Sequence, residues 1–331
     1  MSPSHVPAGQ RPCFEVSRME EARWAGRVPS WGAVLGRAVA GGAIMALALG
    51  SGVALGAPLA DAVNASGRGA QLVAAIPVSV VAAVLVLMTL RRSRRTWTSI
   101  GFGETAASVR ALLTGLGITA ASAALVLGAG TAVGLLSWTR PDLSDLAAFV
   151  AVNRLVALLL EALPEETTLR GLTWTSLREH RPAVVAALGT TLVFMLVPGA
   201  ASMVAAAIRR LTGGEPLPVG LAPPGQHTAD YLILLFLFGL TLVAARTALR
   251  EAPLWTAIGT HLAFLTVNRI TLEGADRNAG WSAEQSSPDA VLLIPLYLLV
   301  AAAAFVVRGR LVRGRPGPVS AATAIPESVG R

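Results

Sequence analysis

Two neighbouring carboxylates and an arginine form the densest group of ionisable residues in an otherwise apolar sequence. They lie in the stretch Leu163–Gly171, which has the sequence LPEETTLRG. On a helix, Glu166 and Arg170 are i, i+4 neighbours and can form an ion pair, which leaves Glu165 on a different face. A carboxylate in an apolar setting is a candidate general base for activating water. A charged helix end at a membrane surface is the structural alternative.

His261 is the second residue whose type suits such chemistry. It lies within an apolar segment, whereas the other three histidines lie outside such segments or at an end. A neutral imidazole can orient water, donate a hydrogen bond to an oxyanion or bind a metal ion. A histidine that packs between helices and bonds to a backbone carbonyl is the alternative.

Four more ionisable residues fall within apolar segments, namely Arg37, Arg154, Glu161 and Arg269. Such groups are costly in a bilayer and usually have a structural or functional reason. Arg37 lies near a segment end, where a long side chain can extend to the interface. Arg154 and Glu161 share a helix face, which favours a structural network between helices.

The composition requires a membrane protein. Hydrophobic residues make up 53% of the 331-residue chain and charged residues only 14%, whereas soluble domains are roughly a quarter charged. A water-soluble chain of this length could not bury so much apolar surface, which excludes a disordered protein, a disulfide scaffold and an ordinary cytosolic enzyme. Cys13 is the single cysteine, so an internal disulfide is excluded as well.

A membrane span needs about 20 mostly apolar residues, and the sequence contains eight such segments. They are Trp31–Leu55, Ala70–Leu90, Ala111–Trp138, Leu146–Leu163, Ala183–Ile208, Ala229–Leu249, Leu254–Leu272 and Ala290–Val307. We therefore expect an all-α polytopic integral membrane protein with about eight transmembrane helices. Trp31, Trp138 and Trp255 lie at segment ends, where interfacial tryptophans are expected.

The arginines indicate the orientation of these segments. All 27 basic residues are arginine and the net charge is +8. With eight spans, most of the arginines between segments fall on one side, in 91–95, 170–181, 246–250 and 308–315, and Arg209 and Arg210 are exceptions. The positive-inside rule then places both termini in the cytoplasm. Because the arginines flank apolar stretches, a nucleic-acid partner is not expected.

Together, these residues resemble the CPBP family of CAAX proteases and bacteriocin-processing (Abi) enzymes, which are eight-span intramembrane proteases. The first family motif, EExxxR, matches Glu165, Glu166 and Arg170. A later motif begins at His261, and the preceding run is also similar to the family, with the pairs Gly239-Leu240 and Arg246-Thr247 followed by LWTAIGT. The resemblance covers about residues 150–275.

The chain departs from the family pattern at two positions. The second motif, FxxxH, begins at Phe194 and has Pro198 where the family has histidine. In the third motif, HxxxN, Leu265 takes the place of the asparagine. The nearest asparagine, Asn268, lies on the same helix face as His261 but about 10 Å along the axis.

The resemblance implies an intramembrane endopeptidase that hydrolyses a peptide bond by Glu-activated water. It makes Glu165, Glu166, His261 and Asn268 the candidate catalytic residues, with Arg170 as structural support of the site. Glu165 would activate the water, and His261 would hold it or stabilise the oxyanion. Zinc or another divalent metal would be held by Glu165 and His261, although catalytic zinc usually has three protein ligands.

The same reasoning divides the chain into five parts. They are a cytoplasmic N-terminal tail (1–30), three transmembrane helices (31–145), a CPBP-like catalytic-type core (146–275), an external loop with the last helix (276–307) and a cytoplasmic Arg-rich tail (308–331). The Arg-only, Ala-rich composition indicates a bacterial protein, integral to the cytoplasmic membrane. Protein prenylation is not expected in bacteria, so the expected partners are the lipid bilayer and a membrane-tethered peptide or protein substrate.

Two other functions remain open. Pro198 favours a catalytically degenerate family member that acts as a membrane binding or immunity protein. A transporter would also place polar groups near proline-interrupted spans. Against transport, the polar groups gather toward the cytoplasmic half, and no second half of the chain mirrors the first.

Overall fold

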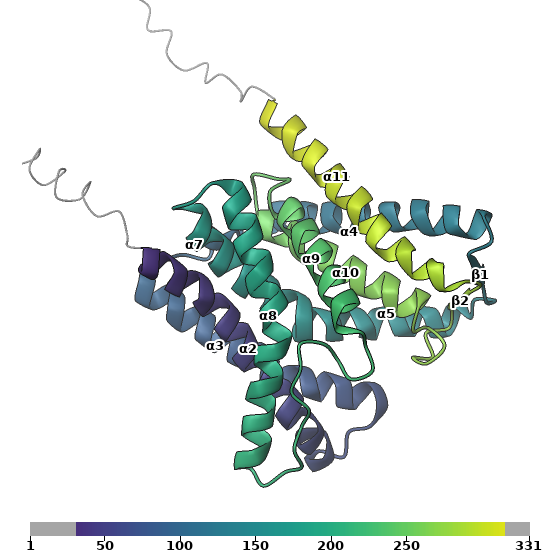
Figure 1. Ribbon diagram of the computed structural model, residues 1–331, viewed down its shortest axis with the longest axis horizontal. Helices are drawn as coiled ribbons and strands as arrows, with labels where there is room; N and C mark the ends of the chain where they lie inside the picture. Colours follow the sequence, from purple (N-terminus) through teal and green to yellow (C-terminus); the bar gives the residue numbers. More distant parts are fainter. Residues whose placement is uncertain (1–30, 315–331) are drawn as a thin grey trace, which may run out of the picture.

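The computed structural model describes residues 31–314, which form an all-α bundle (Figure 1). This confirms the predicted fold class. The predicted tail 1–30, with Cys13, and the last part of the Arg-rich tail, 315–331, lie outside the described residues.

The first part of the bundle is built from three long helices, a 3-10 turn and a short strand. In chain order they are α2 (Trp31–Ala62), α3 (Gly67–Ser93), the 3-10 turn η1 (Thr98–Ile100), α4 (Thr105–Ala132) and β1 (Leu136–Trp138).

The second part begins with one continuous helix, Leu143–Arg178, called the motif helix below because it carries the carboxylate pair. It comprises α5 (Leu143–Ala157), the π-helical η2 (Leu158–Ala162), α6 (Leu163–Glu165), the π-helical η3 (Glu166–Thr173) and α7 (Trp174–Arg178). The elements that follow are α8 (Ala183–Leu211), α9 (Thr228–Arg246), α10 (Pro253–Thr271), β2 (Ala283–Gln285), the 3-10 turn η4 (Pro288–Leu292) and α11 (Leu293–Gly314).

Several predicted span boundaries differ from the observed helix ends, among them Leu55 (observed Ala62) and Val307 (observed Gly314), and two others have a clear local cause. The segment Ala111–Trp138 ends as a helix at Ala132, because Gly134 has a φ of +78° and turns the chain into β1. The segment predicted to end at Leu163 continues to Arg178. A proline normally interrupts a helix because it lacks an N–H donor. Here π-helical turns flank Pro164 and carry the helix onward.

Seven helices within the described residues are long and apolar enough to cross a membrane, and α10 is not among them. Its threonines, with His261, Asn268 and Arg269, make it more polar than the others. Most of its residues are nevertheless buried, because α10 packs against α4, α9 and the motif helix. Since protein surrounds this helix, it need not present an apolar face to lipid.

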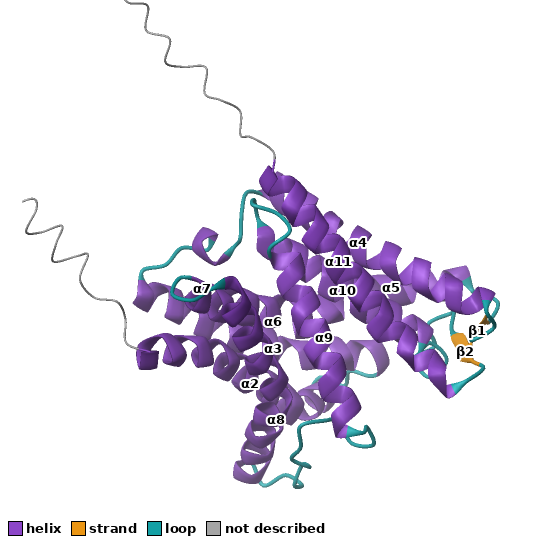
Figure 2. Cartoon of the chain, turned by 45° about the horizontal axis from the view of Figure 1, so that its top comes forward, coloured by secondary structure: helices purple, strands orange, loops and turns teal. Residues whose placement is uncertain are grey.

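The long helices run in alternating directions, which places residues 31 and 314 at the same end of the bundle. At one end of the bundle, which we call the sheet end, β1 pairs antiparallel with β2 (Figure 2). At the other, the arginine-rich end, Arg95 pairs with Glu179 and an Arg313 N–H donates to the carbonyl of Thr247 (3.3 Å).

The backbones of α4 and α10 lie in direct contact. A Cβ atom added to Gly115 would lie 2.1 Å from the carbonyl oxygen of Thr256, and one added to Gly259 would lie 2.2 Å from that of Leu112. Because no real Cβ approaches a carbonyl oxygen so closely, both positions require glycine for the two helices to pack.

We therefore expect Gly115→Val to lower the free energy of unfolding by about 1–3 kcal/mol, because the added side chain forces α4 and α10 apart. Thermal unfolding in detergent measures this effect. Gly117→Val is the matched control, since a Cβ at Gly117 meets nothing within 4 Å. Equal losses in the two variants would contradict the packing argument.

Candidate active site

The motif helix is distorted where its ionisable residues lie. Pro164, in the short α6, has a π-helical stretch on each side. Such stretches are rare and are often found at functional sites. All eight residues of η3, Glu166–Thr173, are buried. The alternative of a charged helix end at the membrane surface is therefore ruled out, because the helix continues through these buried residues to Arg178.

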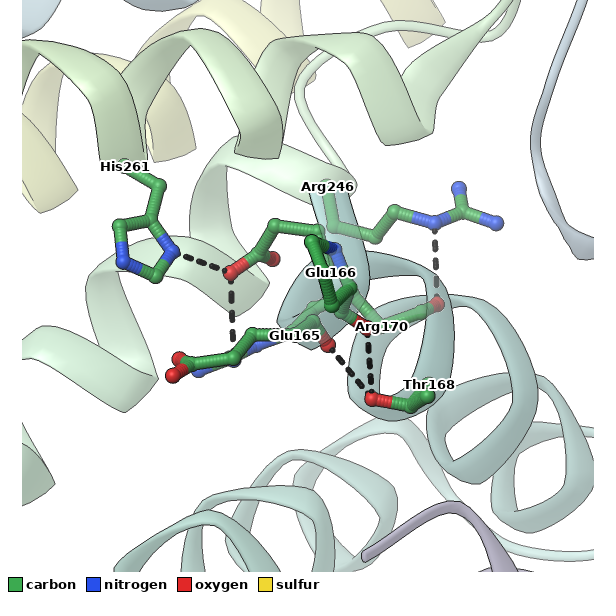
Figure 3. Close-up of polar contacts among 7 residues, drawn as sticks. Glu165, Glu166, Thr168, Arg170, Arg246 and His261 are labelled. Atoms are coloured by element: carbon green, nitrogen blue, oxygen red, sulfur yellow. Dashed lines mark hydrogen bonds and ion pairs between the residues drawn. The ribbon is translucent and has the colours of Figure 1, made fainter. Parts of the chain in front are cut away.

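Glu166 connects the motif helix to α10 (Figure 3). One of its carboxylate oxygens, Oε1, lies 2.9 Å from His261 Nδ1 and 3.3 Å from Arg170 Nη1. The side chains of Glu166 and Arg170 are both 0% exposed, and that of His261 is 3% exposed. The expected Glu166–Arg170 ion pair is thus present, and it also orients the imidazole of His261.

Arg170 and Arg246 extend this polar cluster towards the arginine-rich end. The Arg170 guanidinium lies over the ring of Phe194, 4.5 Å from its centroid. The backbone carbonyl of Arg170 accepts a hydrogen bond from Arg246 Nε (3.3 Å). Arg246 also donates to the carbonyl of Ile100 (3.2 Å).

The structural role of Arg246 was missed at the sequence level, where it counted as an arginine of a cytoplasmic loop and as part of the run that resembles the family. The structure shows it holding the motif helix to the η1 segment through two carbonyls. Its place in the Arg246-Thr247 pair, within the run that resembles the family, was the available signal.

Glu165 faces a cavity of about 830 Å³, whose walls also include Glu161, Pro198, Tyr231 and His261. Within residues 31–314, its carboxylate forms no ion pair or hydrogen bond, whereas that of Glu166 is engaged by two partners. The two adjacent carboxylates therefore differ in kind: one belongs to a buried network, and the other is available to a molecule in the cavity.

The segment between α8 and α9 forms another wall of this cavity, through residues of 217–224. This segment folds back along α8, because the Ser202 hydroxyl accepts from the backbone N–H of Gly220 (3.1 Å) and contacts its carbonyl (3.2 Å). Leu221 then lies against Gly199, where an added Cβ would approach its side chain to 2.7 Å.

Asn268 lies apart from this cavity. Its side-chain oxygen accepts a hydrogen bond from the hydroxyl of Tyr297 (2.9 Å), whereas Leu265, at the family's asparagine position, lines the cavity. The separation follows from helix geometry, since seven residues advance the chain by about 10 Å. The structure therefore brings together Glu165, Glu166, Arg170 and His261, but not Asn268.

The expected network of Arg154 and Glu161 is not formed. Arg154 is exposed, and Glu161 pairs instead with Arg269, which also donates to the side-chain oxygen of Asn153 (3.1 Å). Glu161 lies in the π-helical η2, and this change of helical period alters which face it shares with Arg154. The pair still joins the motif helix to α10.

The residues present do not form the usual zinc site. Of the side chains at residues 31–314, no three from His, Cys, Asp and Glu are grouped closely enough to hold a metal ion. Glu165 and His261 offer two donors, and Pro198 offers none, whereas catalytic zinc usually takes three protein ligands.

This fold and site agree with the family comparison. Residues 147–267, from α5 to α10, match the family model described as type II CAAX prenyl endopeptidase Rce1-like. Residues 147–267 thus form an Rce1-like domain, which matches the CPBP/CAAX protease family. No curated protein and no solved structure matches the chain.

The two carboxylates are expected to respond differently to substitution. Glu166→Ala leaves the buried Arg170 charge without its partner, which costs on the order of 3–5 kcal/mol of unfolding free energy. Glu165→Ala removes a carboxylate that faces the cavity and is expected to change stability little. Thermal unfolding of both purified variants measures the difference, and a larger loss for Glu165→Ala would contradict the assigned roles.

Proposed function

We propose that this protein is an intramembrane endopeptidase that hydrolyses a peptide bond in a membrane-tethered peptide or protein. The observation that carries the proposal is that one cavity is lined both by Glu165, a carboxylate without a hydrogen-bond or ion-pair partner among residues 31–314, and by His261, whose ring Glu166 orients. The Rce1-like family supports the class of reaction. We also propose the bacterial cytoplasmic membrane as its location.

In this mechanism Glu165 takes a proton from a water molecule, whose oxygen attacks the scissile carbonyl carbon. The carbonyl oxygen becomes the oxyanion of a tetrahedral intermediate. When the C–N bond breaks, the proton held by Glu165 passes to the leaving amine. The free carboxylate of Glu165 is well suited to this exchange, because no protein group competes for its oxygens.

His261 acts through its second ring nitrogen. Because Glu166 is paired with Arg170, we assign the proton on Nδ1 to the hydrogen bond that His261 donates to Glu166. Nε2 is then available to hold the attacking water, or to donate to the oxyanion when the ring is protonated. Glu166 and Arg170 are positioning residues in this scheme, and no step depends on a metal ion.

The cavity favours a substrate that is itself apolar or tethered to the membrane. Besides its few polar groups, it is lined by apolar side chains from α2, the motif helix, α8, α9, α10 and the 217–224 segment. Such walls desolvate the bound chain and leave water access to be controlled by the protein.

Cleavage is expected to depend on Glu165 and His261. Removing one member of a catalytic unit often costs several orders of magnitude in rate, so Glu165→Gln and His261→Ala should each reduce cleavage at least about a thousandfold. The assay is incubation of the protein in lipid vesicles with a library of membrane peptides, with products identified by mass spectrometry.

Asp145→Asn is the matched control for that assay, because Asp145 is an exposed carboxylate on the same helix and does not line the cavity. The control should cleave as the unaltered protein does. Cleavage that persists in both site variants would defeat the peptidase proposal.

A catalytically degenerate binding protein is the second candidate, and Pro198 is the observation that favours it. Pro198 lines the cavity, at the position where the resemblance places the family's second histidine. A site without that histidine retains the shape to grip a membrane peptide but has fewer groups to activate water. An immunity protein that sequesters such a peptide fits this description.

Restoring a histidine distinguishes the two candidates. We expect Pro198→His to raise the cleavage rate at least about tenfold if the site is degenerate, because it adds a second imidazole to the wall that faces Glu165. Ala201→His is the matched control, since Ala201 lines the same cavity one helical turn further along α8. No gain, or an equal gain in the control, would contradict a specific role for position 198.

A further inference from the structure

A second cavity, of about 360 Å³, lies near the arginine-rich end and does not share its lining residues with the candidate active site. Its walls come from α3, the η1 segment, the motif helix and the start of α10, and include Ala83, Val86, Phe102, Pro164 and Trp255. The lining carries two hydroxyl groups, those of Ser79 and Thr167, and that of Ser79 already donates to the carbonyl of Leu159. The lining therefore favours a hydrocarbon chain.

Two tryptophans border this cavity. Phe102 contacts Trp97 and Trp255 edge-on, with ring centroids 5.4 and 5.8 Å apart, respectively. Trp97 is 44% exposed. Because tryptophan concentrates at the boundary between hydrocarbon and headgroups, this pair places the cavity where a lipid chain meets its headgroup.

Unpaired positive charge lies at the end of α3, on the stretch of chain that joins the cavity residues Val86 and Trp97. Arg91, Arg92 and Arg94 are exposed at the end of α3, and their side chains form no ion pair with any residue in 31–314. Arg94 has a φ of +53°, which ends the helix and returns the chain to the cavity wall at Trp97. By contrast, the neighbouring Arg95 is held by Glu179.

We propose that this cavity binds one acyl chain of an anionic phospholipid, with the lipid phosphate beside Arg91 and Arg94. The apolar lining selects the chain, and the uncompensated arginines select the charge of the headgroup. Basic clusters at the cytoplasmic ends of membrane helices bind anionic lipids in this way, each residue contributing on the order of 1 kcal/mol. The site is distinct from the proposed hydrolytic one, since it needs neither Glu165 nor His261.

The test is lipid retention by the full-length protein, measured by native mass spectrometry after exchange into detergent with added phosphatidylglycerol or phosphatidylcholine. We expect a stoichiometric phosphatidylglycerol adduct and weaker retention of phosphatidylcholine. Ala83→Trp fills the cavity and should abolish the adduct. Ala124→Trp, at an exposed alanine of α4, is its control and should retain the lipid.

The charge is tested separately by the double variant Arg91→Gln/Arg94→Gln, which leaves the packed interior untouched. It should weaken phosphatidylglycerol binding about tenfold or more, as expected for the loss of two surface arginines. The double variant Arg308→Gln/Arg310→Gln removes the same charge from exposed positions on α11, at the same end of the bundle, and should bind normally.

Equal weakening in both arginine pairs, or retention by Ala83→Trp, overturns the proposal. An uncharged prenyl alcohol that displaces the adduct equally well from the unaltered protein and from the Arg91/Arg94 variant also overturns the proposal. That result would assign the cavity to a prenyl chain. A protein dimer that replaces the lipid adduct would assign it to a second copy. None of these readouts depends on peptidase activity.

Discussion

The structure depends on one carboxylate oxygen that is shared by two cationic or proton-donating partners. Glu166 Oε1 contacts both His261 and Arg170, in a region that solvent does not reach. In such surroundings an isolated charge is very costly, and its attraction to an opposite charge is correspondingly strong. The contact therefore fixes the rotation of the motif helix and the position of α10 at the same time.

Removing one partner of this buried ion pair destabilises the fold more than replacing both partners by apolar residues. The charge that remains is then buried without a partner or solvent. Arg170 already has two nitrogens, Nε and Nη2, without a hydrogen-bond partner in the described part of the chain, and Glu166 Oε2 is in the same position. The face of Phe194 compensates for part of this deficit at Arg170. The Glu166–Arg170–His261 cluster thus fixes how the motif helix and α10 pack together, and its unpartnered polar atoms lower the free energy of unfolding.

The sequence predicted the membrane architecture well, because long apolar runs leave few alternatives to transmembrane helices. It also indicated which side chains gather around Glu166, since the carboxylates, Arg170 and His261 interrupt those runs. It predicted α10 as a span although that helix is the least apolar of the eight, and the reason is visible only in three dimensions. Protein, not lipid, covers most of its surface.

The errors have two physical origins. A prediction based on a period of 3.6 residues cannot anticipate the π-helical turns around Pro164, which extend the helix to Arg178 and change the face that Glu161 occupies. Arg246 was interpreted as a charge that sets the membrane orientation. Its two acceptors are backbone carbonyls, and the spacing of side chains in the sequence does not indicate such acceptors. Asn268, in contrast, behaved as regular helix geometry requires.

The contact between α4 and α10 shows that the region matched by the family model depends on a helix outside it. The family match begins at residue 147, yet Gly259, two residues before His261, rests against the backbone of α4, which precedes that match. The first residues of α10 are also held from outside it, through the bond from the N–H of Leu254 to the carbonyl of Gly101 (3.0 Å). The matched region is therefore no independent module. A fragment limited to residues 147–267 would lack α4 and would leave Gly259 and the first turn of α10 without the backbone that they pack against.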